Sequence, residues 1–298
     1  MSNLCKNRTV IITGAGGGLG RAHALAFSAE GARVIVNDIN EMAAQTVVEQ
    51  ICDNGGTAKA SNFDITNYQA CTDAIQDAVV TYGGLHIVVN NAGINRDRMF
   101  ASMTEDDWDA VIAVHLKGHF CLSSNAVRYW RSQSKAGRTV SGRIINTTSG
   151  AGLQGSVGQS NYAAAKAGIV ALTLNQAAEL ARYDVTANAI TPAARTGMTK
   201  AVAVMAERMK KPDDNRFDYW SADNVSPLLV WLGSEYSAHI TGKVFEAEGG
   251  KISIADGWRS TEGVDKGDRW QPGEIANVMD QLLAKENPAQ PVYGTEWP

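Results

Sequence analysis

A tyrosine and a lysine stand four residues apart in segment 160–166, and a serine precedes the tyrosine by thirteen residues; they are Tyr162, Lys166 and Ser149. Side chains four residues apart on a helix are neighbours. The ammonium of Lys166 can therefore lower the pKa of the Tyr162 phenol below its usual value of about 10. A phenol with a lowered pKa can exchange a proton near neutral pH. Such pairs also arise by chance, so a surface aromatic beside a surface lysine is the alternative unless a second signal supports the chemistry.

A glycine-rich turn near the N-terminus is that second signal. The apolar run 10–12 predicts a buried strand, and apolar residues at helical spacing begin at Leu19. Three glycines lie between the two elements with the spacing Gly-x3-Gly-x-Gly, namely Gly14, Gly18 and Gly20. Glycines let the backbone approach a pyrophosphate, and the helix N-terminus supplies free N–H groups. A strand, a glycine turn and a helix in this order favour a dinucleotide site over a merely flexible turn.

The end of the next predicted strand, 33–38, carries an acidic residue. Asp38 follows Gly20 by eighteen residues. A carboxylate at this place accepts hydrogen bonds from the ribose hydroxyls of NAD and would repel the 2′-phosphate of NADP. No lysine or arginine lies in the glycine turn before Arg21, and none directly follows Asp38. We therefore expect NAD as the cofactor, with a loop or cap aspartate as the alternative interpretation.

Strand-like and helix-like segments alternate along the chain. Further strands are predicted up to about 65 and at 85–90, 143–147, 185–191 and 243–247, and further helices at 41–52, 68–82, 104–113, 116–132, 160–181 and 225–232. This alternation predicts an α/β fold, a doubly wound parallel sheet of the Rossmann type covered by helices on both faces. Ligands bind at the carboxyl ends of the strands in such sheets. Six candidate residues follow predicted strands: Gly14, Asp38, Asp64, Asn91, Ser149 and Pro192.

Two regions stand apart from the alternating pattern. We expect a single domain over residues 1–250 with a lid at about 193–224, and a C-terminal extension over 251–298. The extension carries three tryptophans and an amphipathic helical stripe: Trp258, Trp270, Trp297, Ile275, Val278, Met279, Leu282 and Leu283. We expect it to pack on the body or on a partner subunit.

The predicted lid combines apolar and basic residues. Its apolar residues fall at helical spacing: Met198, Val202, Met205 and Met209. Such a flexible face could accommodate an acyl chain or a sterol. Its basic residues could meet the phosphates of coenzyme A: Arg195, Lys200, Arg208, Lys210 and Lys211. An ordinary amphipathic helix with a solvated basic face is the alternative.

The composition excludes several classes of protein. Lys and Arg number 27 against 31 Asp and Glu, so the formal net charge of -4 does not favour nucleic-acid binding. The hydrophobic content of 44% is enough for a large core, and no apolar run approaches the ~18 residues of a membrane span. The four cysteines lack metal-site spacing and read as free thiols: Cys5, Cys52, Cys71 and Cys121. With a first strand near residue 9 and no room for a signal peptide, we expect a cytoplasmic protein without a bound metal.

Taken together, the motifs resemble the short-chain dehydrogenase/reductase family over about residues 5–250. The matching motifs are Thr13-Gly14-x3-Gly18-x-Gly20, Asn90-Asn91-Ala92-Gly93, Ser149 and Tyr162-x3-Lys166. Segments 36–38, 90–98, 105–109 and 114–118 are similar to the dehydrogenase region of peroxisomal multifunctional enzyme type 2, also called 17β-hydroxysteroid dehydrogenase type 4. That region oxidises (3R)-hydroxyacyl-CoA with NAD, some relatives act on 17β-hydroxysteroids, and bacterial relatives include enzymes of steroid side-chain degradation.

The resemblance also implies roles for individual residues. Tyr162 would exchange the hydroxyl proton, Ser149 would position the same oxygen, and Lys166 would bind the nicotinamide ribose. The implied cofactor-binding residues are Gly14, Gly18, Leu19, Gly20, Asp38, Asp64, Ile65, Asn91, Ala92, Gly93, Tyr162, Lys166, Pro192 and Thr196.

The chain departs from the family pattern at two positions. The family usually has asparagine where His115 stands, and both a place in a proton relay and a structural hydrogen bond are open for this histidine. Pro192-Ala193 replaces the usual Pro-Gly, so the contact with the nicotinamide amide is assigned to Thr196, with Thr199 as the alternative.

The predicted function is NAD-dependent oxidation of a secondary alcohol to a ketone. The expected substrate is a (3R)-3-hydroxyacyl-CoA, including a steroid side-chain thioester, or a 17β-hydroxysteroid. One alternative is a 3-oxoacyl thioester reductase that uses NADPH, against which Asp38 argues. Another is a non-catalytic NAD-binding scaffold, against which the intact Ser149, Tyr162 and Lys166 argue. The family also implies a homodimer or homotetramer.

Overall fold

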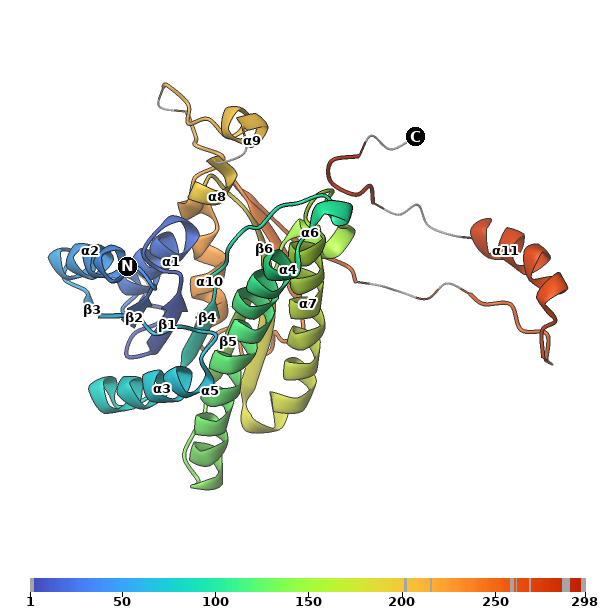
Figure 1. Ribbon diagram of the computed structural model, residues 1–298. Helices are drawn as coiled ribbons and strands as arrows, with labels where there is room; N and C mark the ends of the chain where they lie inside the picture. The colour runs from blue at the N-terminus through green and yellow to red at the C-terminus, as the bar shows by residue number, and fades with distance from the viewer. Residues whose placement is uncertain are drawn as a thin grey trace.

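One twisted sheet forms the centre of the molecule (Figure 1). The computed structural model describes residues 3–200, 203–214, 216–257, 260, 262–267, 269–285 and 290–295. Within these residues the sheet has eight strands in the order β3-β2-β1-β4-β5-β6-β7-β8. The strands are β1 Thr9–Thr13, β2 Arg33–Asn37, β3 Thr57–Ser61, β4 Ile87–Asn90, β5 Gly142–Thr147, β6 Val185–Ala193, β7 Val244–Glu248 and β8 Lys251–Ile254. All neighbours pair in parallel except β7 and β8, which are antiparallel.

Helices cover both faces of the sheet. One face is covered by α1 Gly18–Ala29, α2 Glu41–Asp53 and α10 Ser226–Gly233, and the other by α3 Tyr68–Tyr82, α5 Gly118–Lys135 and α7 Ser160–Leu180. The remaining helices of eight or more described residues are α4 Glu105–Ile112 and α11 Ile275–Leu283. Shorter helical segments are α6 Gly150–Gln154, α8 Gly197–Lys200 and α9 Ala203–Arg208. The predicted doubly wound α/β fold is therefore confirmed.

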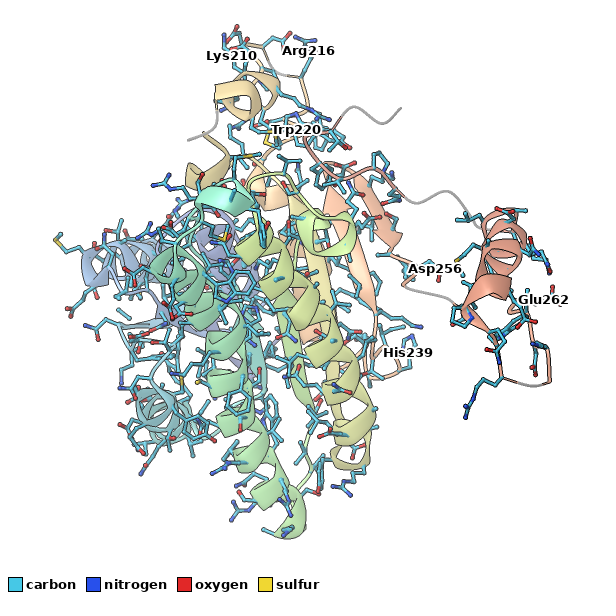
Figure 2. The ribbon with its side chains drawn as sticks, turned by 45° about the vertical axis from the view of Figure 1, so that its right-hand side comes forward. Lys210, Arg216, Trp220, His239, Asp256 and Glu262 are labelled. Carbon is cyan, nitrogen blue, oxygen red and sulfur yellow. The ribbon has the colours of Figure 1, made fainter. Side chains whose placement is uncertain are left out.

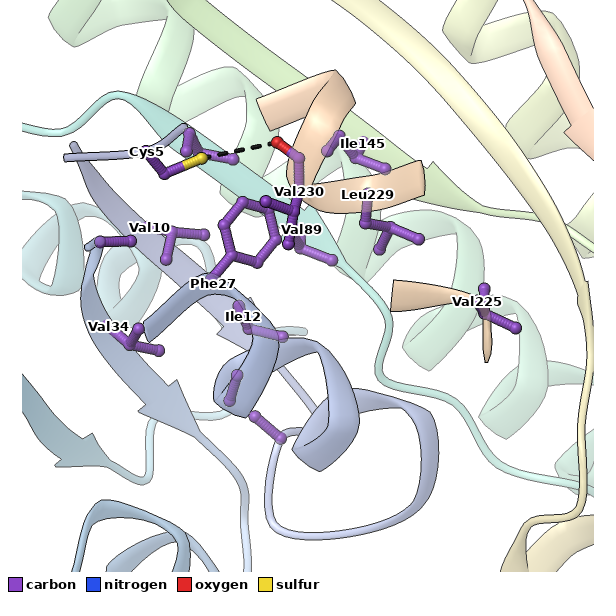
Figure 3. Packing of buried hydrophobic residues seen from close by; sticks show 14 of the residues in the cluster. Cys5, Val10, Ile12, Phe27, Val34, Val89, Ile145, Val225, Leu229 and Val230 are labelled. Carbon is purple, nitrogen blue, oxygen red and sulfur yellow. Dashed lines mark hydrogen bonds between the residues drawn. The ribbon is translucent and has the colours of Figure 1, made fainter. Parts of the chain in front are cut away.

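Alternation along the first strand explains why two separate cores form. Successive side chains of a strand point to opposite faces. Val10 and Ile12 accordingly lie in the core with α1 and α10, and Ile11 lies in the core with α3 and α5. Figure 3 shows the first of these cores, where Phe27 of α1 packs beside Val230 of α10. An apolar run buried on both sides is what a central parallel strand requires.

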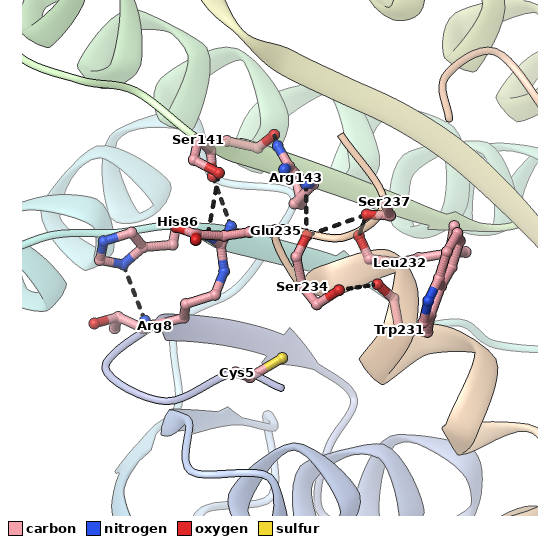
Figure 4. Close-up of polar contacts among 12 residues, drawn as sticks. Cys5, Arg8, His86, Ser141, Arg143, Trp231, Leu232, Ser234, Glu235 and Ser237 are labelled. Carbon is pink, nitrogen blue, oxygen red and sulfur yellow. Dashed lines mark hydrogen bonds and ion pairs between the residues drawn. The ribbon is translucent and has the colours of Figure 1, made fainter. Parts of the chain in front are cut away.

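The amino ends of the strands are held together by buried polar contacts (Figure 4). Arg8 donates hydrogen bonds to the Ser141 carbonyl oxygen at 2.6 Å and to the Ser141 hydroxyl at 3.1 Å. Arg143 donates from Nε to the Ser234 carbonyl oxygen at 3.0 Å, which joins β5 to the end of α10. Burial lowers the pKa of Arg143 to about 10. These contacts fill the amino edge, and the opposite, carboxyl edge carries the candidate residues.

The sheet is longer than the sequence predicted. β8 begins at Lys251, inside the segment assigned to the C-terminal extension, and pairs with β7 from Phe245 to Glu248. Its pattern of two exposed isoleucines, Ile252 and Ile254, gives no buried face that would predict a strand. The boundary drawn at residue 250 therefore lies between two paired strands.

The two predicted helices at 104–113 and 116–132 are parts of one longer helical run. A π-helical turn, Ala113–Lys117, connects α4 to α5, which continues to Lys135. No sequence pattern predicts this turn, because one extra residue in a single turn is too short a feature to alter the hydrophobic pattern.

Helix α11 lies apart from the helices of the sheet (Figure 1). Val278 is buried there, but Met279 and Leu283 are exposed. Packing of this apolar stripe on a partner subunit stays a prediction. Trp258 and Trp297 lie outside the described residues. None of the helices in the described ranges is long and apolar enough to cross a membrane.

Candidate active site

The predicted site residues come together at the carboxyl edge of the sheet. Three candidate residues follow a strand directly: Gly14 follows β1, Asp38 follows β2 and Asn91 follows β4. Ser149 comes two residues after the end of β5. The order of the sheet places β2, β1, β4 and β5 side by side. Residues from four distant segments therefore meet along one edge.

The glycine turn packs too closely for side chains. Gly14 has φ +63°, and a Cβ there would lie 2.8 Å from Ala92 Cα. A Cβ at Gly20 would lie 2.1 Å from the Gly14 carbonyl oxygen. The turn leads into α1, whose N-terminus at Gly17 is capped by no side chain of the described chain. Its first N–H groups are thus available to an anionic ligand such as a pyrophosphate.

Asn91 braces the glycine turn from the neighbouring strand. Its Nδ2 donates to the Thr13 carbonyl oxygen at 2.9 Å, and its backbone N–H donates to Thr13 Oγ1 at 3.0 Å. The backbone N–H of Ala92 donates to the same hydroxyl at 3.1 Å. The structure thus gives Thr13, which the sequence motif contains without an assigned role, a central place in the turn. Its position directly before Gly14 was the available signal.

The Asp38 carboxylate is fixed beside the glycine turn. Oδ2 accepts a hydrogen bond from the Gly16 N–H at 2.9 Å, and Oδ1 accepts one from the Asn40 N–H at 2.9 Å. The next side chain, Ile39, is exposed. The edge of the site nearest to Asp38 therefore presents a carboxylate and an apolar side chain.

The structure also shows the contacts of three further predicted cofactor residues, Thr196, Asp64 and Ile65. Thr196 lies over the turn, since its Cγ2 would be 3.6 Å from a Cβ at Gly18. Its backbone N–H donates to Thr199 Oγ1 at 2.7 Å, so the two candidate threonines lie together. Asp64 accepts a hydrogen bond from the Thr66 N–H at 2.8 Å, and Ile65 is buried against Gly118.

Ser149, Tyr162 and Lys166 also converge. The Ser149 side chain accepts a hydrogen bond from the Ala151 N–H at 3.2 Å and so begins α6, and it hydrogen-bonds the Tyr162 hydroxyl. Lys166 is buried and donates from Nζ to the Thr147 carbonyl oxygen at 2.6 Å. Its Nζ lies 5.5 Å from the centre of the Tyr162 ring.

The pKa of the Tyr162 phenol shifts in the opposite direction from the prediction. Burial raises the pKa of Tyr162, and the hydrogen bond from Ser149 offsets only part of this rise. Burial also lowers the pKa of Lys166 to about 7. The Lys166 amine, which is bonded to Thr147, thus does not offset the effect of burial on the Tyr162 phenol in the chain alone. Lowering the phenol pKa requires the additional positive charge of a bound ligand.

His115 lies directly beside Tyr162. The two rings meet edge to face with their centres 5.1 Å apart. His115 Nε2 lies 3.0 Å from the Ile94 nitrogen and 2.8 Å from the Ile94 oxygen. Burial lowers the pKa of His115 to about 3, so the ring is neutral, and its buried Nδ1 has no partner among the described residues. A Cβ at Gly93 would lie 2.3 Å from His115 Cε1, which explains the glycine at that position.

Below this site a buried amide network joins the strands to two helices. Asn90 Nδ2 donates to Ser123 Oγ and to Asn146 Oδ1, both at 2.8 Å. Asn146 Nδ2 donates in turn to Thr173 Oγ1 at 2.9 Å. Only Asn90 belonged to a motif quoted from the sequence, because contacts between distant segments leave no local pattern. The network fixes α5 and α7 relative to β4 and β5.

The lid contacts differ from the prediction. Arg195 is not free for a ligand, because its guanidinium pairs with Asp218 and donates to the Met209 carbonyl oxygen at 2.8 Å. Met209 is buried rather than open to a ligand. Arg208 lies over the ring of Trp220, 5.7 Å from its centre. Lys210 is exposed and lies at the top of Figure 2, above Trp220. Val202 and the side chains of Met198 and Lys200 lie outside the described residues.

Comparison with known proteins identifies the family. The family model of the short chain dehydrogenases matches residues 8–207. The chain belongs to the short chain dehydrogenases. It is therefore an oxidoreductase that acts on CH–OH groups with a nicotinamide dinucleotide, NAD or NADP.

Several relatives of this short chain dehydrogenase share most of its length. "Hydroxyacyl-CoA dehydrogenase ChsB1" of Mycobacterium tuberculosis is 42% identical over 297 residues, which cover 97% of this chain and 92% of that protein. "Peroxisomal multifunctional enzyme type 2" of Mus musculus is 38% identical over 92% of this chain, which spans only 36% of the mouse protein. The crystal structure of a short chain dehydrogenase from Mycobacterium avium is 54% identical, with a TM-score of 0.90 over 98% of this chain and all of that one. The predicted resemblance is thus confirmed.

The described part of this short chain dehydrogenase fits a dinucleotide. Gly14 and Gly20, which leave no room for a Cβ, the uncapped start of α1 and the Asp38 carboxylate bonded to Gly16 all lie in or beside the same turn. No group of three or more metal-ligating side chains occurs among the described residues.

Proposed function

We propose that the protein oxidises a (3R)-3-hydroxyacyl-CoA to the 3-oxoacyl-CoA with NAD. The observation that carries the proposal is the arrangement of the Tyr162 hydroxyl, Ser149 and Lys166 at the edge where the glycine turn and Asp38 also lie. The name of the M. tuberculosis relative, a hydroxyacyl-CoA dehydrogenase along 97% of this chain, supports the substrate class.

In this proposal the proton moves through Tyr162. Bound NAD would accept the hydride from the carbinol carbon. Ser149, already hydrogen-bonded to the Tyr162 hydroxyl, would hold the substrate oxygen beside that hydroxyl. Tyr162 would take the hydroxyl proton and return it to solvent afterwards. Its pKa would have to fall from above 10 to about 7, which requires roughly 4 kcal/mol or more of preferential stabilisation of the phenolate.

Lys166 would supply part of that stabilisation. Its buried ammonium now donates to Thr147, and a bound ribose would add acceptors beside it. Hydrogen bonds to the charged form would raise the pKa of Lys166 from about 7 and keep its positive charge near Tyr162. The same ammonium would then lower the pKa of the phenol.

His115 would serve the proton path from a fixed, neutral position. Its Nε2 is engaged at Ile94, and its unpartnered Nδ1 is suited to a buried water. Thr196, which lies over Gly18, would contact the nicotinamide amide. Pro192, near the end of β6, would form part of the same side of the nicotinamide site.

The cofactor in this proposal is NAD rather than NADP. The Asp38 carboxylate beside Gly16 would accept the ribose hydroxyls of NAD, and its charge would repel the 2′-phosphate of NADP. The exposed Ile39 offers that phosphate no cationic partner. We also infer a cytoplasmic homodimer or homotetramer, a setting with which the four free cysteines agree.

A matched substrate panel tests the proposal. The purified protein would be given NAD with a (3R)-3-hydroxyacyl-CoA, its (3S) epimer, the corresponding free acid and a 17β-hydroxysteroid, and NADH absorbance would be followed. We expect a kcat/KM at least about tenfold higher for the (3R) thioester than for any other member. Replacing NAD with NADP should lower it by a similar factor. Equal rates for thioester and free acid, or turnover of the steroid alone, would exclude the CoA assignment.

A further inference from the structure

The end of the chain returns to the candidate active site. Residues 292–294 run beside the loop that follows α6, where Ser156 and Tyr293 form a parallel bridge. The Val157 N–H donates to the Tyr293 carbonyl oxygen at 2.9 Å, and the Tyr293 N–H donates to the Gly155 carbonyl oxygen at 3.3 Å. The short helix α6, which precedes this loop, begins directly after Ser149, so the terminal segment lies one short helix away from the reacting groups.

The Tyr293 side chain lies on the residue that follows Ser149. A Cβ at Gly150 would be 2.5 Å from the Tyr293 hydroxyl oxygen and 2.8 Å from its Cε2. The absence of a side chain at Gly150 is thus what lets the tyrosine ring reach this position. Partial burial raises the pKa of Tyr293, and the charges of Glu246 and Glu248, on β7, add to the rise. The ring therefore lies between the α6 loop and the carboxyl end of β7.

Tyr293 belongs to a larger group of exposed apolar side chains at this edge. Met99 and Phe100 follow β4, Val157 follows α6, and Tyr293 comes from the terminal segment. All four are exposed, at 61%, 77%, 43% and 51% of their full surface.

Short distances connect these segments. The Met99 sulfur would be 3.9 Å from a Cβ at Gly158, and Val157 Cβ would be 3.3 Å from a Cβ at Gly294. Apolar surface gathered in one place outside a core marks a binding site for an apolar group. Met99, Val157 and Tyr293 therefore come from adjoining segments, and together they form an apolar wall at the loop that follows α6.

We propose that Tyr293, with Val157 and Met99, binds the apolar chain of the substrate and sets the preference of the enzyme for long chains. The inference rests on the proposed function, because it takes the acyl chain of that substrate as the ligand. An extended acyl chain would remove these exposed side chains from water, and a short chain would not reach them. Tyr293 is thus a specificity residue and takes no part in the proton transfer.

Two substrates of the same chemistry and different chain length test the inference. The ratio of kcat/KM for (3R)-3-hydroxyhexadecanoyl-CoA to that for (3R)-3-hydroxybutyryl-CoA would be measured in wild type, Tyr293→Ala and Tyr293→Phe. We expect Tyr293→Ala to lower the ratio by about tenfold or more, chiefly through KM for the long substrate. Tyr293→Phe should keep the wild-type ratio, because it retains the ring faces. Equal changes for both substrates, or the same loss in both variants, would overturn the inference.

The matched control is Tyr236→Ala, which removes an exposed tyrosine from the loop between α10 and β7. It should leave the ratio unchanged.

Thermal unfolding shows whether Tyr293→Ala remains folded. Binding of hexadecanoyl-CoA and butyryl-CoA, measured by calorimetry, needs no turnover. If wild type oxidises neither substrate, the proposed function fails. Weaker binding of the long thioester alone by Tyr293→Ala would still support the apolar wall, and unchanged binding would exclude it.

Discussion

At the scale of single residues, the main feature of the site is a phenol and an amine whose pKa values are both shifted against their charged forms. Burial raises the pKa of Tyr162 and lowers that of Lys166 to about 7. Burial thus disfavours the charged form of both groups in the chain alone, and a bound cationic ligand would favour the phenolate. Burial thus links the acid–base chemistry to the presence of the cofactor.

Tyr162→Phe removes only the hydroxyl that Ser149 bonds. We expect turnover to fall by about a hundredfold or more, because the proton loses its acceptor. Cofactor affinity, measured by NADH fluorescence, should change little, since the glycine turn and Asp38 are untouched. Tyr183→Phe, at the far end of α7, is the control and should keep wild-type turnover. Turnover of Tyr162→Phe comparable with wild type would remove this residue from the mechanism.

At the scale of elements, the His115 ring packs the π-helical turn Ala113–Lys117 against the segment after β4. The turn places the His115 ring against Gly93 and Ile94, and the edge of the ring meets Tyr162. The glycine is needed because a Cβ would be 2.3 Å from His115 Cε1. The orientation of Tyr162 thus depends on a glycine in another segment.

Gly93→Ala tests this contact. We expect the added methyl to displace the His115 ring, to lower the free energy of unfolding by about 1–3 kcal/mol and to reduce kcat. Urea unfolding and steady-state kinetics measure the two effects. Gly257→Ala is the control, because a Cβ there meets no atom within 4 Å. Wild-type stability and kcat in Gly93→Ala would show that the ring adapts without consequence.

At the scale of the whole molecule, three of the five histidines are buried and a fourth, His86, is partly buried, and burial disfavours the charged form of all four. Burial lowers the pKa of His23 and His115 to about 3, that of His86 to about 4, and that of His119 well below its usual value. The unfolded chain binds these protons near pH 6.5 and the folded chain does not. Folding stability therefore decreases as the pH falls from about 6.5 towards the folded pKa values.

The expected result is a lower free energy of unfolding at pH 5.5 than at pH 7.5. Each of these histidines should contribute about 1 kcal/mol to the difference. The lowered pKa of Lys166 acts in the same direction, since its folded form loses a proton near pH 7 and its unfolded form near 10.5. Urea unfolding at the two pH values measures the effect. Activity regained on return to pH 7.5 shows that the change at pH 5.5 is reversible. A flat profile would mean that the rings take up protons without unfolding.

The sequence determined the elements whose signal is local. Helix α3 occupies Tyr68–Tyr82 as predicted, and the glycine turn lies between β1 and α1 as its motif requires. The positions of Gly14, Asp38, Asn91 and Ser149 at the carboxyl edge followed from strand ends alone. Strand and helix periods and turn glycines act over a few residues, so they can be recognised without knowledge of the fold.

Only the tertiary structure decided which residues meet across long separations. Burial raises the pKa of Tyr162 despite the hydrogen bond from Ser149, Arg195 forms an ion pair with Asp218, and the Tyr293 ring packs on Gly150. The tertiary structure also added β8 and the π-helical turn. Burial, ion pairing between segments and edge-strand pairing depend on how the whole chain is packed. No short stretch of sequence contains that information.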